Sequence, residues 1–196
     1  EIWTAFDLSK DYPLRATLIK ETDTENLLVI VGHHIAFDGW SMPIFVNELV
    51  ANYEAIIKDQ EVTLPTLSVQ YADYAIWQKK YINEDILVNE IGYWKDKLSD
   101  IPLLNLPADY PRPSTQSLKG ESIDHVMSSD LTKKINAISN KEGVTPFITL
   151  LAAYNILLYK YSGQPDICVG SPVANRDQAE IEPLIGFFLN TLPLRN

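Results

Sequence analysis

Residues 27–34 constrain the fold more than any other segment of the sequence. Side chains alternate between the two faces of a strand, and here both faces are apolar until the last two residues, His33 and His34. A strand with two apolar faces must be covered on both sides, which predicts a central, buried position in a sheet. Residues 15–20 form a second β-rich run, and the polar segment 21–26 between the two runs predicts a hairpin. The two histidines are expected to point in opposite directions at the strand end.

Helical patterns follow this strand. Asp38-Gly39 predicts a turn, after which Ser41 is expected to cap a helix that runs to about Lys58. A second helical region is expected over residues 69–98, because aromatic side chains recur there every three or four positions. The first three of these aromatic residues are expected to pack in the core: Tyr71, Tyr74 and Trp77.

The second half of the chain opens with a change of composition. Residues 101–117 are polar and rich in proline, which predicts an extended crossover between two parts of the protein. Thr145-Pro146 predicts the start of a helix that ends at Ser162-Gly163 and that, being apolar almost all round, should be buried. The remaining expected elements are a strand at 121–127, an amphipathic helix at 129–140 and strands at 167–173 and 189–194. Helices and strands therefore mix throughout an α/β (α+β) chain.

The composition argues against several classes of partner. Sixteen basic residues face 26 acidic ones, and the formal net charge of −10 disfavours nucleic acids and anionic membranes. The longest apolar run, 147–159, is shorter than the ~20 residues that cross a bilayer, and no signal peptide is visible at Glu1. Cys168 stands alone, which favours a reducing, cytoplasmic location and a small buried side chain. The missing initiator Met suggests a piece excised from a longer protein.

Two adjacent histidines and a nearby carboxylate carry the candidate chemistry. Imidazole is the natural proton acceptor near neutral pH, so His33 and His34 suit proton transfer. Asp38 can return through the turn at Gly39 to orient an imidazole or to anchor the loop to a cation. A metal site is disfavoured, because adjacent strand residues face opposite ways and His125 is the only other histidine. The residues alone leave open a proton-transfer site and a pair of structural histidines.

The sequence around these residues resembles a known family. Residues 33–41, HHIAFDGWS, resemble the HHxxxDG motif of the condensation domains of nonribosomal peptide synthetases. Three further segments resemble later motifs of that family and stand in the same order: 71–78 (YADYAIWQ), 171–176 (SPVANR) and 185–192 (IGFFLNTL). The resemblance covers nearly the whole chain.

This resemblance implies a fold of two lobes, each similar to chloramphenicol acetyltransferase, with the active site between them. Residues 1–100 would then be the C-terminal part of the first lobe, with the HHxxxDG motif. Residues 101–120 would be the proline-rich crossover, and residues 121–196 would begin the second lobe. The fold is expected to be incomplete at both ends, with unpaired strand edges and uncovered apolar faces.

The resemblance also implies roles for the site residues. In this family a tethered amine attacks a tethered thioester and an amide forms. His34 would lie nearest the amine, as general base or as a positioning group, with His33 beside it. Asp38 is expected to be structural and to form a bidentate ion pair with Arg176.

Four further residues are expected to support the site. Gly39 would permit the turn, Trp40 would pack, and Asn190 would face the substrate channel. Gly186 would allow a close approach of the backbone.

Cofactors and partners follow from the same resemblance. The chain itself is expected to bind no cofactor and no metal, because the substrates travel on the phosphopantetheine arms of partner domains. Those partners would be donor and acceptor peptidyl carrier proteins and an adjacent adenylation domain. Three alternatives stay open: an epimerisation relative, a standalone acyltransferase that uses coenzyme A, and a non-catalytic carrier-docking or inactive module. Trp40-Ser41 favours condensation over epimerisation, and both histidines argue against a cyclising relative.

Overall fold

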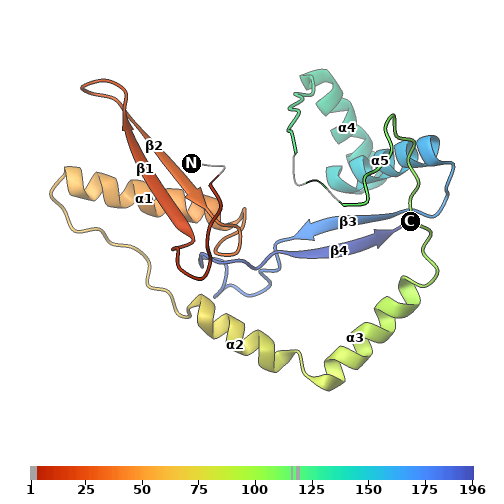
Figure 1. Ribbon diagram of the computed structural model, residues 1–196, viewed down its shortest axis with the longest axis horizontal. Coiled ribbons are helices and arrows are strands. Elements are labelled where there is room, and N and C mark those ends of the chain that lie inside the picture. The colour runs from red at the N-terminus through yellow and green to blue at the C-terminus, as the bar shows by residue number, and fades with distance from the viewer. Residues whose placement is uncertain (1–3, 116, 118–119) are drawn as a thin grey trace. The chain divides into compact units, whose positions relative to one another are not determined.

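A computed structural model describes residues 4–115, 117 and 120–196 of the chain (Figure 1). Residues 1–3, at the start of the segment expected to be the C-terminal part of the first lobe, and residues 116, 118 and 119 of the expected crossover lie outside the described part. In chain order the elements are β1 (Leu14–Lys20), β2 (Asn26–Gly32), α1 (Ser41–Ile57), α2 (Tyr71–Tyr81), α3 (Glu84–Lys97), α4 (Ser129–Glu142), α5 (Pro146–Ser162), β3 (Cys168–Val173) and β4 (Asn190–Arg195).

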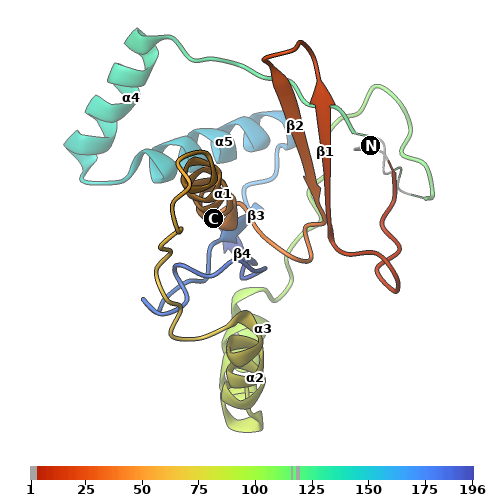
Figure 2. The same cartoon turned by 90° about the vertical axis from the view of Figure 1, so that its left-hand side faces the viewer.

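The hairpin expected at the start of the chain is confirmed. Strands β1 and β2 pair in antiparallel fashion from Leu14 opposite Gly32 to Lys20 opposite Asn26, and they lie side by side in both views (Figures 1 and 2). The expected central position of β2 is wrong for the described residues, where β1 is its only partner. Two apolar faces call for cover, but the described residues leave Leu27 and Leu28 nearly half exposed.

Helix α1 begins and ends close to the expected residues, but its cap differs. Ser41 is the first helical residue, and its backbone N–H donates to Asp38 Oδ1 at 3.0 Å. The expectation that Ser41 caps the helix is therefore wrong, because Asp38 supplies the capping oxygen. The Ser41 hydroxyl is thus free for other partners.

The helical region expected over residues 69–98 is two helices. α2 ends at Tyr81 and α3 begins at Glu84, where Oδ1 of the preceding residue, Asn83, accepts the Ile86 N–H at 3.0 Å. At the start of α2, Asp73 accepts the Gln70 N–H at 2.8 Å in a capping box. The expected core position is confirmed for Tyr74 but not for Tyr71 and Trp77, which are 37% and 42% exposed.

The elements after the proline-rich segment match their local signals. Ser128 caps α4 and Thr145 caps α5, and both helices end at a glycine with a left-handed backbone, Gly143 and Gly163. Gly163 has a φ of 71°, which favours glycine.

Two expectations for this half of the chain are wrong. Residues 121–127 form no strand, and Ile123 and Val126 are at least 90% exposed, because no described strand lies alongside to bond their backbone. α5 buries only Leu158, so its apolar surface is largely uncovered in the described part. Cys168 is a free thiol, and it is only partly buried rather than buried as expected.

Contacts divide the chain into two units. Unit 1 comprises Glu1–Gly92 and Ser171–Leu192, and unit 2 comprises Tyr93–Gly170 and Pro193–Asn196. The core of unit 1 is a cluster of buried residues from α2 and the segment before β4: Tyr74, Ile181, Leu184 and Phe188. The lobe boundaries implied by the resemblance stay a prediction.

Unit 2 contains an arginine that ties three segments together. Arg195 bonds both carboxylate oxygens of Asp166, with Nε–Oδ1 at 2.9 Å and Nη2–Oδ2 at 2.6 Å. Its Nη1 donates to the carbonyls of Lys97 and Ser99 at 2.9 and 2.8 Å.

In the described part no single helix has the length and apolar character to cross a membrane. α4 and α5 meet those criteria only as a pair bent by 103°.

Candidate active site

The two histidines follow β2 directly, and their environments differ. His33 lies partly buried, with its ring edge-on to Phe6 at a centroid distance of 5.6 Å. Its backbone N–H donates to the Pro13 carbonyl at 2.8 Å, and its Nδ1 accepts the Ile35 N–H at 3.0 Å. The imidazole of His33 therefore holds the turn that follows the strand.

His34 is exposed and its ring nitrogens are uncommitted. Neither nitrogen hydrogen-bonds any residue in the described part of the chain. The ring meets Phe187 edge-to-face, with centroids 5.5 Å apart and planes at 82°. Of the two histidines, His34 is thus the more exposed, and it is the one with neither ring nitrogen engaged within the described residues.

Four residues after His34, the side chain of Asp38 is buried and fully engaged. Its Oδ1 accepts the Ser41 hydroxyl at 2.8 Å and Arg176 Nη2 at 3.2 Å. Its Oδ2 accepts the backbone N–H of Phe188 at 3.1 Å, and its own N–H donates to the Gly186 carbonyl at 3.1 Å. One carboxylate thus joins the turn after the histidines to a segment about 150 residues later.

The pKa of Asp38 lies below its ordinary value. Burial by itself raises this pKa, since it disfavours the charged form. The hydrogen bonds from the Phe188 N–H and from the side chain and backbone of Ser41, with the charge of Arg176, outweigh burial. Asp38 is therefore a carboxylate at neutral pH, acting as a fixed acceptor rather than as a proton donor.

Ser41 is fully buried, with 0% of its surface exposed. Its hydroxyl oxygen accepts the Gly186 N–H at 3.1 Å and Arg176 Nη2 at 3.0 Å. Its single proton lies within reach of Asp38 Oδ1 at 2.8 Å and of the Gly186 carbonyl at 3.0 Å. Ser41 was expected as a helix cap and as the end of the HHIAFDGWS motif, but its contacts with Arg176 and Gly186 were not expected.

The expected pairing of Asp38 with Arg176 is present, but it is not bidentate. Only Nη2 reaches the carboxylate, because Nη1 donates to three backbone carbonyls, those of Ile181 (2.7 Å), Leu184 (2.7 Å) and Glu182 (3.3 Å). The guanidinium also lies 4.0 Å from the centre of the Phe188 ring. Arg176 therefore stabilises the conformation of residues 181–184 through their carbonyls, and it also supplies the counter-charge of Asp38.

The roles expected of Gly39 and Trp40 are corrected. Gly39 has no positive φ, and a Cβ there would meet no atom within 4 Å, so the turn does not require glycine. Trp40 is 48% exposed rather than packed, and its indole N–H donates to the Glu182 carbonyl at 3.1 Å. Trp40 is thus a second tie between the motif and the segment that Arg176 holds.

Gly186 has the close approach that was expected. A Cβ at this position would overlap the ring of Tyr71. The Tyr71 hydroxyl donates to the carbonyl of the next residue, Phe187, at 2.8 Å, and its ring stands edge-on to Phe188 at 5.1 Å. Helix α2 therefore contacts the segment that bears Phe187 directly, through Tyr71. This contact was not expected from the sequence, where Tyr71 was interpreted as a core residue.

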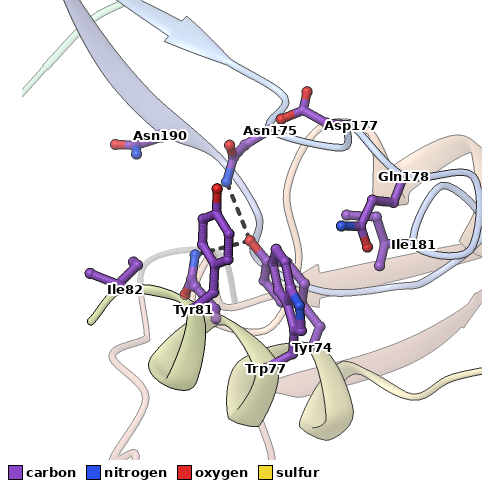
Figure 3. A pocket seen from close by; sticks show the side chains of 10 residues that line it. Tyr74, Trp77, Tyr81, Ile82, Asn175, Asp177, Gln178, Ile181 and Asn190 are labelled. Carbon is purple, nitrogen blue, oxygen red and sulfur yellow. Dashed lines mark hydrogen bonds between the residues drawn. The ribbon is translucent and has the colours of Figure 1, made fainter. Parts of the chain in front are cut away.

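A cavity of about 230 Å³ in unit 1 is lined by α2 and by the segment that leads to β4 (Figure 3). Tyr74 OH lies at one wall and accepts Gln78 Nε2 at 3.0 Å and Asn175 Nδ2 at 3.3 Å. Asn190 lines this cavity and His34 does not. The expected place of Asn190 in a substrate channel stays a prediction.

Comparison with known proteins identifies relatives over the whole chain. The profile of the condensation domain matches residues 1–196. Malpinin synthetase from Mortierella alpina is 44% identical over 196 residues, which cover 100% of this chain and 2% of that protein. One of the linear gramicidin synthase proteins from Brevibacillus parabrevis is 50% identical over 196 residues, again 100% of this chain but 4% of that protein.

A solved structure agrees with the fold. The X-domain from teicoplanin biosynthesis has a TM-score of 0.86 at 27% identity, and the match covers 98% of this chain and 44% of that chain. The fold class and the resemblance inferred from the motifs are confirmed. Because the match extends over every residue, from the histidine motif through the segment that buries Asp38, the chain belongs to the condensation-domain family of nonribosomal peptide synthetases.

Proposed function

We propose that this chain takes part in amide bond formation between two thioester-bound substrates, as part of a longer synthetase. The small share of the relatives' length that it spans supports a role within a larger polypeptide. The observation that carries the proposal is the contrast between the two histidines. His33 accepts a backbone N–H at its Nδ1, whereas neither ring nitrogen of His34 has a hydrogen-bond partner among the described residues, and His34 lies near the buried hydrogen-bond network of Asp38.

In the proposed step the acceptor's amine nitrogen attacks the donor's thioester carbonyl carbon. The C–N bond forms, the C–S bond breaks, and the thiol leaves with a proton. His34 accepts the proton that the amine loses and returns it to the departing sulfur. Such proton transfer typically contributes 10²–10⁴-fold to a rate.

The amine itself needs little help to become nucleophilic. An α-amino group has a pKa near 7.7–8, so roughly a tenth to a sixth of it is neutral at pH 7, at a cost of about 1–1.4 kcal/mol. His34 therefore matters more for removing the proton after attack. Positioning of the two tethered substrates contributes the remainder of the acceleration.

The partners proposed for this reaction are donor and acceptor carrier proteins, with an adenylation domain adjacent in the same synthetase. The substrates would arrive on phosphopantetheine arms, and the chain itself would bind no cofactor. A cytoplasmic location fits the free thiol of Cys168.

The test is amide formation by the condensation domain that contains this chain, supplied with two loaded carrier proteins. We expect His34→Ala to lower turnover by 10²-fold or more, and the matched variant of another exposed histidine, His125→Ala, to leave it unchanged. Equal product from wild type and His34→Ala would support amide formation as the reaction and would contradict a catalytic role for His34.

A docking module is the alternative function, and one comparison favours it. A further solved structure holds an X-domain in complex with OxyB, and it matches this chain with a TM-score of 0.85 at 28% identity. A condensation-type fold can thus serve to bind another protein. Carrier binding without any amide product, in wild type and variant alike, would support this alternative.

A further inference from the structure

The ring of His34 has one aromatic neighbour in the described part of the chain. Phe187 stands edge-to-face to it, with centroids 5.5 Å apart, and is itself 38% exposed. An exposed histidine without hydrogen bonds can adopt several side-chain rotamers. The edge of a fixed aromatic ring favours the rotamers that keep this contact.

The backbone that bears Phe187 is held at three consecutive residues. The Gly186 N–H donates to the Ser41 hydroxyl oxygen (3.1 Å), and the Gly186 carbonyl accepts the Asp38 N–H (3.1 Å). The Phe187 carbonyl accepts the Tyr71 hydroxyl at 2.8 Å. The Phe188 N–H donates to Asp38 Oδ2 at 3.1 Å. Phe187 is therefore an exposed ring on an anchored segment.

The anchor from α2 is steric as well as polar. The Tyr71 ring occupies the space where a Cβ of Gly186 would lie, and it contacts the Phe188 ring at 5.1 Å. The Phe187 backbone is thus confined between the motif after His34 on one side and Tyr71 on the other.

We propose that Phe187 is a positioning residue that sets the orientation of the His34 imidazole, and that Tyr71 holds Phe187 in place for this purpose. The contact itself is independent of any reaction. What the orientation serves, delivery of a ring nitrogen to the attacking amine, rests on the proposed function.

The experiment compares variants of the condensation domain that contains this chain, labelled with ¹³C and ¹⁵N at histidine. In Phe187→Leu we expect the ring-proton chemical shifts of His34 to move and its side-chain couplings to average. We expect kcat to fall three- to tenfold, with KM for both loaded carriers unchanged, and Phe187→Tyr to restore both readouts. The matched control, Phe147→Leu at an exposed phenylalanine of α5, should change neither.

A second pair of variants reaches the same histidine from α2. Tyr71→Phe keeps the ring and removes the hydrogen bond to the Phe187 carbonyl, so the His34 signals should shift in the same direction by a smaller amount. Tyr53→Phe removes an exposed tyrosine hydroxyl from α1 and is the control. This pair decides the matter should Phe187→Leu fail to fold.

The outcomes separate this inference from the proposed reaction. A folded Phe187→Leu domain, or in its place Tyr71→Phe, with wild-type His34 signals and wild-type kcat overturns the positioning role. Amide formation that still depends on His34 would survive that result. Conversely, the wild-type domain could form no amide while the His34 signals still change in the Phe187 and Tyr71 variants. That result would support the positioning role and contradict the proposed reaction.

Discussion

Each unit of this chain contains an arginine that holds an aspartate and several backbone carbonyls, and the two do so differently. In unit 2, Arg195 grips Asp166 with two parallel hydrogen bonds, and the side chains are 23% and 34% exposed. In unit 1, Arg176 reaches Asp38 with one nitrogen only, and these side chains are 1% and 2% exposed. The better geometry therefore belongs to the more exposed pair.

The difference teaches that burial, as well as hydrogen-bond geometry, must enter any expectation of how much an ion pair contributes to stability. The Asp166–Arg195 pair is partly exposed, so water and salt screen it more than the buried pair, and we expect it to contribute less to stability than the buried pair does. The Asp38–Arg176 pair is dry, so its charges depend on each other and on the surrounding donors and acceptors. Asp38 of this pair also binds the backbone of Phe188, next to Phe187, whose ring contacts His34.

Removal of one aspartate from each pair gives the largest contrast. Asp38→Ala leaves a buried guanidinium without its counter-charge, and we expect it to lower the free energy of unfolding by about 3–5 kcal/mol. Asp166→Ala should cause a much smaller loss that shrinks further in 1 M NaCl. Urea titrations of both variants measure this, and equal losses at the two sites would contradict the comparison.

A smaller contrast is expected from two buried serines. The Ser41 oxygen accepts two N–H donors, so Ser41→Ala leaves both unpaired at a cost of about 1–3 kcal/mol. Ser139 in α4 is similarly buried, but within the described residues its hydroxyl bonds only the Ile135 carbonyl and the Thr149 hydroxyl. Ser139→Ala should therefore cost less in the same titration, and the reverse order would show that the Ser41 network is replaceable.

The dependence of stability on pH sharpens the comparison further. The folded pKa of Asp38 is lowered, so its stabilisation is complete above the unfolded value of about 3.9 and is lost as pH falls through the folded value. The difference in unfolding free energy between wild type and Asp38→Asn should thus be constant from pH 7 to about 5 and shrink below pH 4. A difference that grows on acidification would mean that Asp38 is protonated in the fold.

Local signals in the sequence predicted most elements. Thr145-Pro146 and Gly163 mark the ends of α5 because a hydroxyl cap, a ring-fixed φ and a left-handed residue act within one turn. The burial of α5 and a strand over residues 121–127 were wrong, since an apolar pattern shows that cover is needed and not that the chain supplies it.

The site was predictable only in part, for the same reason. His34 and Asp38 stand in one short motif, and the partner Arg176 followed from the family resemblance. Two features of the site have no signal in the local sequence. One is the set of carbonyls that engages Arg176 Nη1 and leaves the ion pair monodentate, and the other is the hydrogen bond from Tyr71 to the Phe187 carbonyl, 116 residues away.

The distance along the chain between Asp38 and its partners has a consequence for synthesis. Arg176 and Phe188 lie 138 and 150 residues beyond it, so the turn after the histidines emerges from the ribosome long before its anchors. At a translation rate of about 5–20 residues per second, the interval is roughly 7–30 s. During that time Asp38 lacks its hydrogen bonds to Arg176 and Phe188, so the histidine turn gains these long-range contacts only after residue 188 has been made.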